Sequence, residues 1–302
     1  MADVMMLDSH FSTTKNVTGQ KPAIVSRSGD KFETTLFLPQ KEGRRGEGGL
    51  RTKGYFKTSL EEKPLLTVVT VVFNGQKHVE QTIQSVINQS YDNVEYIVID
   101  GGSTDGTLDI IKKYEHAIDY WVSEPDKGIY DAMNKGIKLA SGKYASFLNA
   151  DDYYLENSLE VFAKYILANE YPDIVAGAIL IEENNYRRVL RKPSLKDFGK
   201  NLHHQAITVK SRLLRETGFD CSYKIAADRD LMTKLVKKGS SSILFEDPVA
   251  VFREGGRGSS FFNYQKEVFK SNIKNLGFSF AIKRFALSVV GRLIFSLPGV
   301  RK

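Results

Sequence analysis

Apolar residues between positions 65 and 148 follow two alternating patterns. Unbroken runs of β-branched and aromatic residues predict strands that are buried on both faces. Between these runs, apolar residues recur every three or four positions, which predicts helices with one buried side. The alternation indicates an α/β fold with a mostly parallel central sheet flanked by helices. The predicted strands cover residues 65–73, 94–99, 118–122 and 144–148, and the predicted helices cover residues 78–88, 108–114 and 129–139.

Polar and acidic residues directly follow each of the four predicted strands. In an open α/β sheet, the carboxyl ends of the parallel strands line the ligand-binding crevice. Four successive strands place such residues at one edge. The general polarity of loops does not readily explain this placement after every strand. The candidate site residues at this edge are Asn74, Asp100, Glu124, Asp126, Asn149, Asp151 and Asp152.

Two common phosphate-binding loops are missing from the sequence. A dinucleotide fold requires G-x-G-x-x-G between the first strand and its helix, where this chain has the single glycine Gly75. The pair Gly142-Lys143 lacks the upstream glycine and the following hydroxyl of a P-loop. The sequence therefore excludes both classes of site.

A nucleotide-sugar site fits the same edge of the sheet. Asp100 precedes two glycines, so its carboxylate could accept hydrogen bonds from a base or ribose while the backbone stays close. Asp151 and Asp152 could bind a hard divalent cation, Mn²⁺ or Mg²⁺, through oxygen. Such a cation would stabilise a diphosphate as a leaving group. A solvated turn that caps a helix is the alternative for the two aspartates, and the pattern alone does not separate the two.

Four segments, in order and at matching spacing, resemble the motifs of the family 2 glycosyltransferases. The resemblance extends over residues 65–260 and implies the GT-A nucleotide-diphospho-sugar transferase fold. The subgroup that the chain is similar to consists of bacterial enzymes that build capsule, exopolysaccharide or O-antigen. The matching segments are Val68–Asn74, Ile99–Thr107, Ser123–Gly136 and Phe147–Asp152.

The resemblance implies that the strand-end residues bind the donor. Asp100 is expected to contact the nucleoside, and Asp151, which closes the family's D-x-D motif, is expected to meet the metal. Asp152 is a second candidate metal ligand. The first Asp of that motif is Asn149 here, and Met133 stands where many relatives carry Arg, so an Arg–diphosphate contact is not carried over. The residues expected at the donor are Phe73, Asn74, Asp100, Asp126, Asn134, Asn149 and Asp151.

A further segment, Tyr223–Leu231, resembles the part of the family that carries the catalytic base. Asp228 is the expected base, although the Glu that often precedes it is Ala227 in this chain. A carboxylate that takes the proton of the attacking acceptor hydroxyl typically contributes about 10²–10⁴-fold to the rate. Asp230 is expected to cap the helix that follows.

Four polar residues outside these motifs are candidates for contacting the diphosphate or the acceptor. His204 and Gln205 stand where the look-alike subgroup has a similar His-Gln pair, and a loop histidine bonded to backbone is the alternative. Arg253 and Arg257 belong to a Gly-rich basic stretch that could close over a diphosphate, or could form an ordinary turn.

The net charge of +7 lies entirely in the last forty residues of this 302-residue chain, where eight basic residues face only Glu267. A nucleic-acid binder would more often spread basic residues over its folded face, so we expect no nucleic-acid partner. Residues 278–298 predict a basic amphipathic helix, which favours an anionic membrane surface over simple packing on the domain. The predicted apolar face holds Ile282, Phe285, Ala286, Val289 and Leu293, and the polar face holds Arg284, Ser288 and Arg292.

The pattern divides the chain into three parts. Residues 1–62 form an N-terminal extension with one possible strand at Thr35–Pro39 and a Gly- and charge-rich loop at 41–49. Residues 63–262 form the catalytic domain, and residues 263–302 form the basic helical tail. A single cysteine, no long apolar run and no secretory signal favour a cytoplasmic protein on the inner face of the cell membrane.

Together these features predict an inverting glycosyltransferase of the hexosyl or N-acetylhexosaminyl type. It would move a sugar from a nucleotide-diphosphate donor to a saccharide acceptor, which the resemblance implies is lipid-linked. One alternative is a sugar-1-phosphate nucleotidyltransferase, although the segment Asn74–His78 offers little of the Gly-rich basic loop that it needs. The other is a nucleotide-sugar-binding protein without activity.

Overall fold

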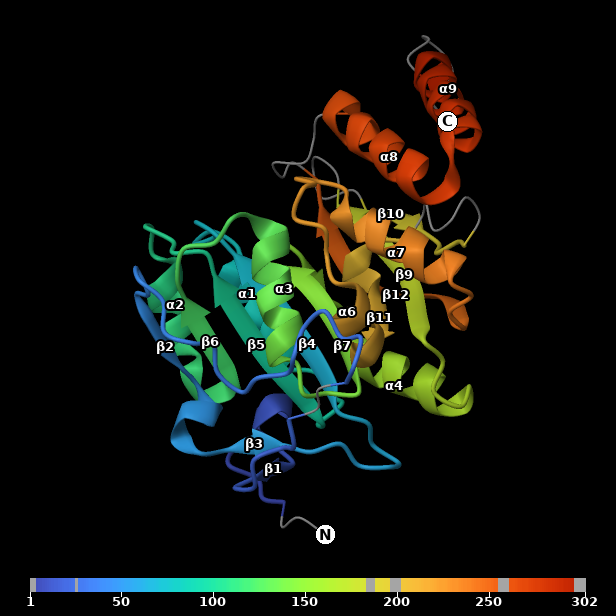
Figure 1. The fold of residues 1–302 in the computed structure, drawn as a ribbon. Helices are drawn as coiled ribbons and strands as arrows, with labels where there is room; N and C mark the ends of the chain where they lie inside the picture. Colours follow the sequence, from blue (N-terminus) through green and yellow to red (C-terminus); the bar gives the residue numbers. More distant parts are fainter. Residues whose placement is uncertain (1–3, 25–26, 183–187, 196–201, 255–260, 296–302) are drawn as a thin grey trace.

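The computed structural model describes residues 4–24, 27–182, 188–195, 202–254 and 261–295 (Figure 1). Its centre is a mixed sheet of ten strands in the described part, in the order β2-β6-β5-β4-β7-β11-β9-β12-β8, with β10 paired to β9. The four strands that carry the predicted site residues are parallel neighbours, which confirms the predicted α/β class. They are β6 (Tyr120–Ser123), β5 (Val94–Asp100), β4 (Leu66–Val72) and β7 (Tyr144–Asn149).

The second half of the sheet is mostly antiparallel. β11 pairs antiparallel with both β7 and β9, whereas β12 runs parallel to β9 along most of its length. Short antiparallel strands, β8 and β10, pair with β12 and β9. The strands of this half are β8 (Tyr153–Tyr154), β9 (Ile174–Glu182), β10 (Arg188–Arg191), β11 (Ile207–Lys210) and β12 (Ser242–Arg253).

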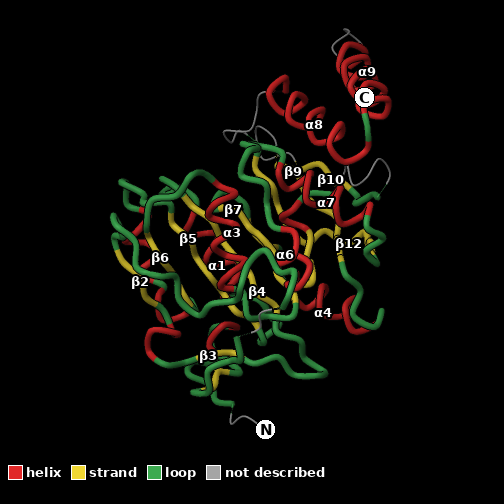
Figure 2. The backbone as a smooth tube through the Cα atoms, in the orientation of Figure 1, coloured by secondary structure: helices red, strands yellow, loops and turns green. Residues whose placement is uncertain are grey.

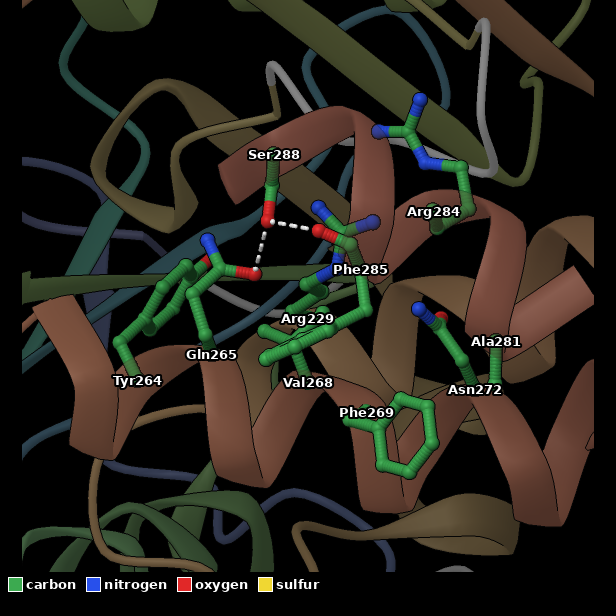
Figure 3. Close-up of a pocket in the computed structure, with 10 residues that line it drawn as sticks. All are labelled: Arg229, Tyr264, Gln265, Val268, Phe269, Asn272, Ala281, Arg284, Phe285 and Ser288. Atoms are coloured by element: carbon green, nitrogen blue, oxygen red, sulfur yellow. Dashed lines mark hydrogen bonds between the residues drawn. The ribbon is translucent and has the colours of Figure 1, made fainter. Parts of the chain in front are cut away.

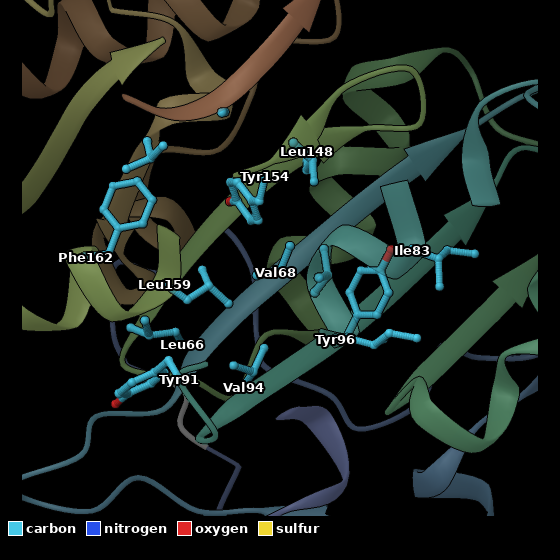
Figure 4. Close-up of a cluster of buried hydrophobic side chains, with 14 of the residues drawn as sticks. Leu66, Val68, Ile83, Tyr91, Val94, Tyr96, Leu148, Tyr154, Leu159 and Phe162 are labelled. Atoms are coloured by element: carbon cyan, nitrogen blue, oxygen red, sulfur yellow. The ribbon is translucent and has the colours of Figure 1, made fainter. Parts of the chain in front are cut away.

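Helices cover both faces of the sheet because the central strands are apolar on both sides. Along β4, Val68 packs into the core with α1 (Val79–Ile87), α2 (Thr107–Lys113) and α4 (Ser158–Ala168) (Figure 4). Its neighbour Val69 points to the other face. The helices on that second face are α3 (Ile129–Leu139), α6 (Ser211–Thr217) and α7 (Ala227–Lys237).

The N-terminal extension is part of this domain, although most of it runs as loop (Figure 2). β2 (Gly46–Gly48) lies inside the stretch expected to be a loop and adds an antiparallel edge strand to β6. The prediction of a strand at Thr35–Pro39 is wrong. This segment is irregular in the structure, and Leu36 and Leu38 are buried without strand pairing. The remaining short elements are β1 (Val17–Thr18), β3 (Phe56–Lys57), and the 3₁₀ turns Ser12–Thr14, Leu50–Lys53, Glu115–Ala117 and His204–Ala206.

Two buried cations fix the extension: Arg51 binds it to the sheet, and Lys57 binds two parts of the extension together. Arg51 forms an ion pair of 2.5 Å with Glu95 of β5, and both side chains are almost fully buried. Arg51 also donates a hydrogen bond of 3.1 Å to the carbonyl of Leu36. Lys57, also buried, donates to the carbonyls of Thr13 and Lys15.

The chain ends in two helices, α8 (Phe261–Leu276) and α9 (Phe278–Phe295), which stand away from the body of the domain (Figure 1). α8 is anchored to α7, because the Glu267 carboxylate accepts the backbone N–H groups of Lys224, Ile225 and Ala226 at 2.8–3.1 Å. Asp230 accepts hydrogen bonds from two further side chains of α8. The predicted boundary at residue 263 stays a prediction. Within the described residues, no helix combines the length and apolar character needed to cross a bilayer.

Candidate active site

The ends of the four parallel strands lie level with one another. Asp100 stands opposite Val72 of β4 and Ser123 of β6, and Asn149 stands opposite Val71 of β4. The residues that follow these strands therefore leave the sheet at one edge. This is the arrangement expected for a ligand crevice at the carboxyl ends of parallel strands.

Asp100 builds the turn between β5 and α2. Its carboxylate is fully buried and accepts hydrogen bonds from the backbone N–H and hydroxyl of Ser103 and from the Ser123 hydroxyl at 2.5 Å. Asn74 follows β4 in the left-handed region, at φ 51°, and accepts a bond of 2.8 Å from the Thr104 N–H. The Asp100 carboxylate is already hydrogen-bonded inside the fold. Its predicted contact with a nucleoside stays a prediction.

Asp126 and Phe73 lie over the same turn. A side chain at Gly101 would place its Cβ 2.5 Å from a carboxylate oxygen of Asp126 and 3.4 Å from the Phe73 ring. A side chain at position 101 would therefore displace the Asp126 carboxylate. Phe73 is about half exposed, and Asp126 is partly exposed, so both remain open to a ligand at this edge.

The loop after β7 separates the two adjacent aspartates. Asp152 is fully buried and accepts bonds from Gln205 Nε2 at 2.8 Å and the Arg253 N–H at 3.1 Å. Burial, with the neighbouring Asp151 charge, raises the pKa of Asp152 to about 7. The burial does not favour Asp152 as a metal ligand. Gln205, which was predicted to contact substrate, is bonded to Asp152 within the fold.

Asp151 remains as the accessible carboxylate of this loop. It is partly exposed, and its carboxylate has no hydrogen bond or ion pair with the described residues. Nearby, the Asn149 Oδ1 atom is buried without a hydrogen-bond partner in the described part. A hard cation bound through one carboxylate plus substrate phosphate oxygens needs this kind of oxygen donor. These two residues therefore fit such a cation. No group of three or more His, Cys, Asp or Glu residues among those described could hold a metal by itself.

Two other predicted contacts are occupied within the fold. Arg253 pairs with Glu182 at 3.1 Å and donates to the backbone oxygen of Asp151 at 2.9 Å, so it shapes the loop. Asn134 exchanges amide hydrogen bonds of 3.0 and 2.9 Å with the backbone of Phe219. Their predicted contacts with substrate stay predictions that these bonds do not favour. Arg257 lies outside the described residues.

Asp228 lies at the start of α7, and its carboxylate is held from two sides. Tyr130 donates to Oδ1 at 3.2 Å and His204 Nδ1 lies 3.1 Å from Oδ2, while 24% of the Asp228 side chain stays exposed. Burial by itself would raise the pKa of Asp228, but the hydrogen bond and charge of His204 outweigh it and hold that pKa below its usual value. In turn, burial lowers the pKa of His204, but the Asp228 bond and surrounding carboxylates raise it overall. The site thus contains an ionised, accessible carboxylate.

Two of these contributions were missed in the sequence. Tyr130 belongs to a quoted motif but is 98 positions from Asp228, and no short-range pattern joins the two. The sequence identifies Glu267 only as the acidic residue of the tail, whereas in the structure it binds the N–H groups just ahead of Asp228. Both act across distances in sequence that only the folded sheet closes.

Comparison with known protein families gives a direct match to this chain. Glycosyl transferase family 2 matches residues 67–235, which is more than half of the sequence and covers every strand-end residue described above. The chain belongs to glycosyl transferase family 2. The protein is therefore a glycosyltransferase, as the motifs predicted.

Curated relatives of this glycosyltransferase come from bacteria. A PGL/p-HBAD biosynthesis glycosyltransferase of Mycobacterium bovis is 31% identical over 182 residues, which are 55% of this chain and 68% of the relative. A candidate teichuronic acid biosynthesis glycosyltransferase of Bacillus subtilis, TuaG, is 28% identical over 200 residues, covering 63% of this chain and 79% of TuaG. These names place the chain among homologues involved in bacterial glycolipid and polysaccharide synthesis.

Solved structures of similar fold include two with bound ligands. Staphylococcus aureus TarS 1–349 in complex with UDP has a TM-score of 0.56 and 17% identity, covering 78% of this chain and 75% of TarS. The mannosyltransferase PcManGT from Pyrobaculum calidifontis, in complex with GDP-Man and Mn²⁺, has a TM-score of 0.57 and 20% identity, covering 78% and 77%. At these identities the likeness shows the fold alone, and it confirms the GT-A prediction.

Two cavities formed by described residues border α7. One of about 20 Å³ lies beside His204 and Asp228 and is otherwise lined by apolar side chains. The other, about 120 Å³, lies between α7, α8 and α9 (Figure 3). It is lined in part by Arg284 and Ser288, so these residues of the predicted polar face turn toward α8, while Ile282 of the predicted apolar face is exposed. The predicted apolar face of α9 stays largely open, with Ile282 47% and Phe285 39% exposed. Its contact with a membrane surface stays a prediction.

The His204–Asp228 pair predicts the acid limit of the enzyme. Replacing His204 by Gln removes the charge that lowers the pKa of Asp228, so burial should raise that pKa. With Asp228 as the expected base, the acid limb of kcat/KM against pH should then move to higher pH. Donor affinity at pH 8 should stay within about twofold, since the base is ionised there in both proteins.

His203→Gln is the matched control for this experiment. Burial lowers the pKa of His203 to about 4, so this neighbour is neutral over the working range and its loss should leave the acid limb in place. An unchanged profile in His204→Gln would show that His204 does not set the ionisation of the base.

Proposed function

We propose that this protein is an inverting glycosyltransferase that moves a hexosyl or N-acetylhexosaminyl group from a nucleoside-diphosphate sugar to a saccharide acceptor. The observation that carries the proposal is the Asp228 carboxylate, ionised, partly exposed and held by His204 and Tyr130. A second accessible carboxylate, that of Asp151, follows one of the parallel strands. The bound UDP of TarS and GDP-Man of PcManGT support a nucleotide-sugar donor.

In the proposed reaction, Asp228 takes the proton from an acceptor hydroxyl. The hydroxyl oxygen forms a bond to the anomeric carbon as the bond from that carbon to the diphosphate oxygen breaks on the opposite side. His204 and Tyr130 fix the orientation of the carboxylate, and the positive charge of His204 keeps it ionised before the step. The nucleoside diphosphate leaves with the bonding electrons.

Asp151 would hold a divalent cation, with Asn149 beside it as a neutral oxygen donor. When bound, the cation would neutralise charge on the leaving diphosphate. The Mn²⁺ of PcManGT supports this assignment. The predicted participation of Asp152 is less well supported, since both of its carboxylate oxygens are already bonded within the fold.

A thermal-shift screen of nucleotide sugars tests the donor and the metal together. At least one UDP-, GDP-, dTDP- or CDP-sugar should raise the melting temperature, since a ligand at about 100 times its Kd stabilises by about 2.7 kcal/mol. Mn²⁺ should enlarge that shift in the native protein. Asp151→Asn should abolish the enlargement, because it removes the accessible carboxylate.

Asp109→Asn is the control, because Asp109 is an exposed carboxylate on α2. It should keep the full effect of Mn²⁺. If no nucleotide sugar shifts the native protein, the proposed donor class is wrong. If Asp151→Asn responds to Mn²⁺ like the native protein, the metal assignment is wrong.

We further propose that α8 and α9 hold the enzyme at an anionic membrane, where a lipid-linked acceptor would be found. Large apolar side chains on this pair are open to solvent, with Phe262 71% and Phe278 62% exposed. Lys266, Lys270 and Lys283 are exposed on the same two helices. Apolar anchors mixed with basic residues are typical of segments that lie in a bilayer surface. On this proposal the protein acts on the cytoplasmic face of the membrane.

Deleting residues 278–302 should release the protein from anionic liposomes in a flotation assay. The deletion must spare α8, because Glu267 binds the backbone ahead of Asp228. Liposomes of neutral lipid are the control and should bind neither protein strongly. Retention of the shortened protein on anionic liposomes would contradict the role of α9.

The two alternative functions find less support in the described structure. The segment after β4 carries one lysine, Lys77, and no Gly-rich loop for a nucleotidyltransferase. A protein that only binds nucleotide sugars has no need for an ionised carboxylate with two orienting partners. The transfer reaction uses this group directly.

A further inference from the structure

The segment Lys41–Gly48 forms part of the crevice edge, although it precedes the residues that the family match covers. β2 pairs antiparallel with β6, and Gly46 stands opposite Ser123, the last residue of β6. The N–H of Arg45 donates to the Ser123 carbonyl at 2.7 Å. Arg45 therefore sits beside the point where β6 ends and the site residues begin.

A buried ion pair fixes the position of this segment. Arg44 donates two bonds, at 2.9 and 2.7 Å, to one oxygen of Glu124, and Lys135 binds the other oxygen at 2.8 Å. Arg44 and Glu124 are both nearly inaccessible to solvent. Glu124, one of the strand-end residues singled out in the sequence, thus serves as an anchor. Since neighbouring side chains in an extended chain point to opposite sides, holding Arg44 inside leaves Arg45 outside.

Arg45 is exposed and reaches the turn that Asp100 organises. Its guanidinium donates to the carbonyl of Ser103, the residue whose N–H and hydroxyl bind the Asp100 carboxylate. Lys41, four positions earlier, donates to the Pro125 carbonyl at 2.6 Å. Pro125 in turn lies against Gly102, which has φ +85°. Segments 41–45, 101–103 and 125–126 therefore converge in one wall.

The wall presents hydrogen-bond donors. An arginine side chain carries five N–H donors and no acceptor, and among the described residues the Arg45 guanidinium donates only to the Ser103 carbonyl. Of the acidic groups nearby, Asp100 binds Ser103 and Ser123, and one oxygen of Asp126 accepts the Gly128 N–H at 2.8 Å. Directly beside the Arg45 guanidinium, a carbonyl oxygen of a base can accept a hydrogen bond, whereas an amino group of a base offers only further donors.

We propose that Arg45 is a specificity-determining residue that selects donors whose base carries a carbonyl where cytosine and adenine carry an amino group. The inference rests on the proposed nucleotide-sugar function and assigns part of the nucleoside site to the N-terminal extension. Uracil and cytosine differ at this position by a carbonyl acceptor against an amino donor, and guanine and adenine differ in the same way. Arg45 favours the first member of each pair.

The test measures Kd for UDP, CDP, GDP and ADP by calorimetry with Mn²⁺ present. In Arg45→Met, the Kd of UDP or GDP, whichever the native protein binds, should rise about tenfold, the range of one hydrogen bond to a charged group. The Kd of the amino-bearing partner should change little, so the preference within the pair collapses. The melting temperature without ligand should stay nearly constant because Arg45 is exposed.

Lys53→Met is the matched control. Lys53 is an exposed cation of the same extension, but its partner is Glu115, 3.6 Å away at the surface. It should keep the native preference. An Arg45→Met protein that keeps the native preference overturns the role of Arg45 and leaves the proposed function standing. A native protein that binds none of these four nucleotides and does not bind dTDP overturns both.

Discussion

Asp228→Asn is expected to lower kcat for sugar transfer by about 10²–10⁴-fold, the usual contribution of a general base. The substitution keeps the size of the side chain and one oxygen for Tyr130 or His204, so the fold and the donor site should persist. Donor Kd should therefore stay within about threefold. Initial rates of nucleoside-diphosphate release, measured with saturating donor and acceptor, give the first quantity, and calorimetry gives the second.

Asp220→Asn serves as the control for that experiment. Asp220 lies in the loop just before α7 and pairs with Lys274 at 2.9 Å on the surface, where such a pair contributes about 0–1 kcal/mol. Its loss should leave transfer unchanged. If Asp228→Asn retained more than half of the native rate, the proton would have to leave the acceptor by another route, and the assignment of the base would fall.

Arg51→Met is expected to cost about 3–5 kcal/mol in the free energy of unfolding, because it leaves the Glu95 carboxylate buried without its cation. Burial would raise the pKa of Glu95, but Arg51 and hydrogen bonds from Ser141 and Thr67 hold it below its usual value. A carboxylate with a lowered pKa stabilises the fold above its unfolded pKa of about 4.5, and this contribution is lost as the pH falls through the folded value. The difference between native and variant protein should thus shrink in acid. Guanidinium unfolding at pH 7 and pH 4 measures it.

Two further variants separate the charge from the packing. Lys53→Met removes an exposed cation of the same segment and should change stability by less than about 1 kcal/mol. Arg51→Met with Glu95→Leu should recover most of the loss, since replacing both members of a buried pair by apolar groups is often nearly neutral. A loss that persists in the double variant would place the effect in packing around residue 51.

The sequence predicts the parallel half of the sheet well because β4, β5 and β7 are dominated by apolar and β-branched residues and show no competing helical pattern. The strand-end residues follow from the same runs. Sequence reasoning does not reveal which carboxylates stay open. Asp151 and Asp152 are adjacent and identical in chemistry, yet Gln205, 53 residues later, binds one of them and leaves the other accessible.

The N-terminal extension was the least predictable part of the chain. Its contacts are made by single side chains to distant partners, such as Arg51 to the carbonyl of Leu139, 88 positions away. No periodicity records contacts of this kind. The glycines at 46–49 suggest a flexible linker, but in the structure they allow the backbone to lie flat on Trp121, where a Cβ at Gly48 would approach the ring nitrogen to 2.7 Å.

The position of β2 over Trp121 also affects how the protein can interact with other molecules. β6, with the sequence Tyr-Trp-Val-Ser, is short and apolar, and β2 occupies its free hydrogen-bonding side. Without β2, that side would be an open template for strands of other molecules. Because β2 is only three residues long and carries Glu47, it gives little for a neighbouring chain to pair with. The extension thus also protects the enzyme from self-association through the edge of its own sheet.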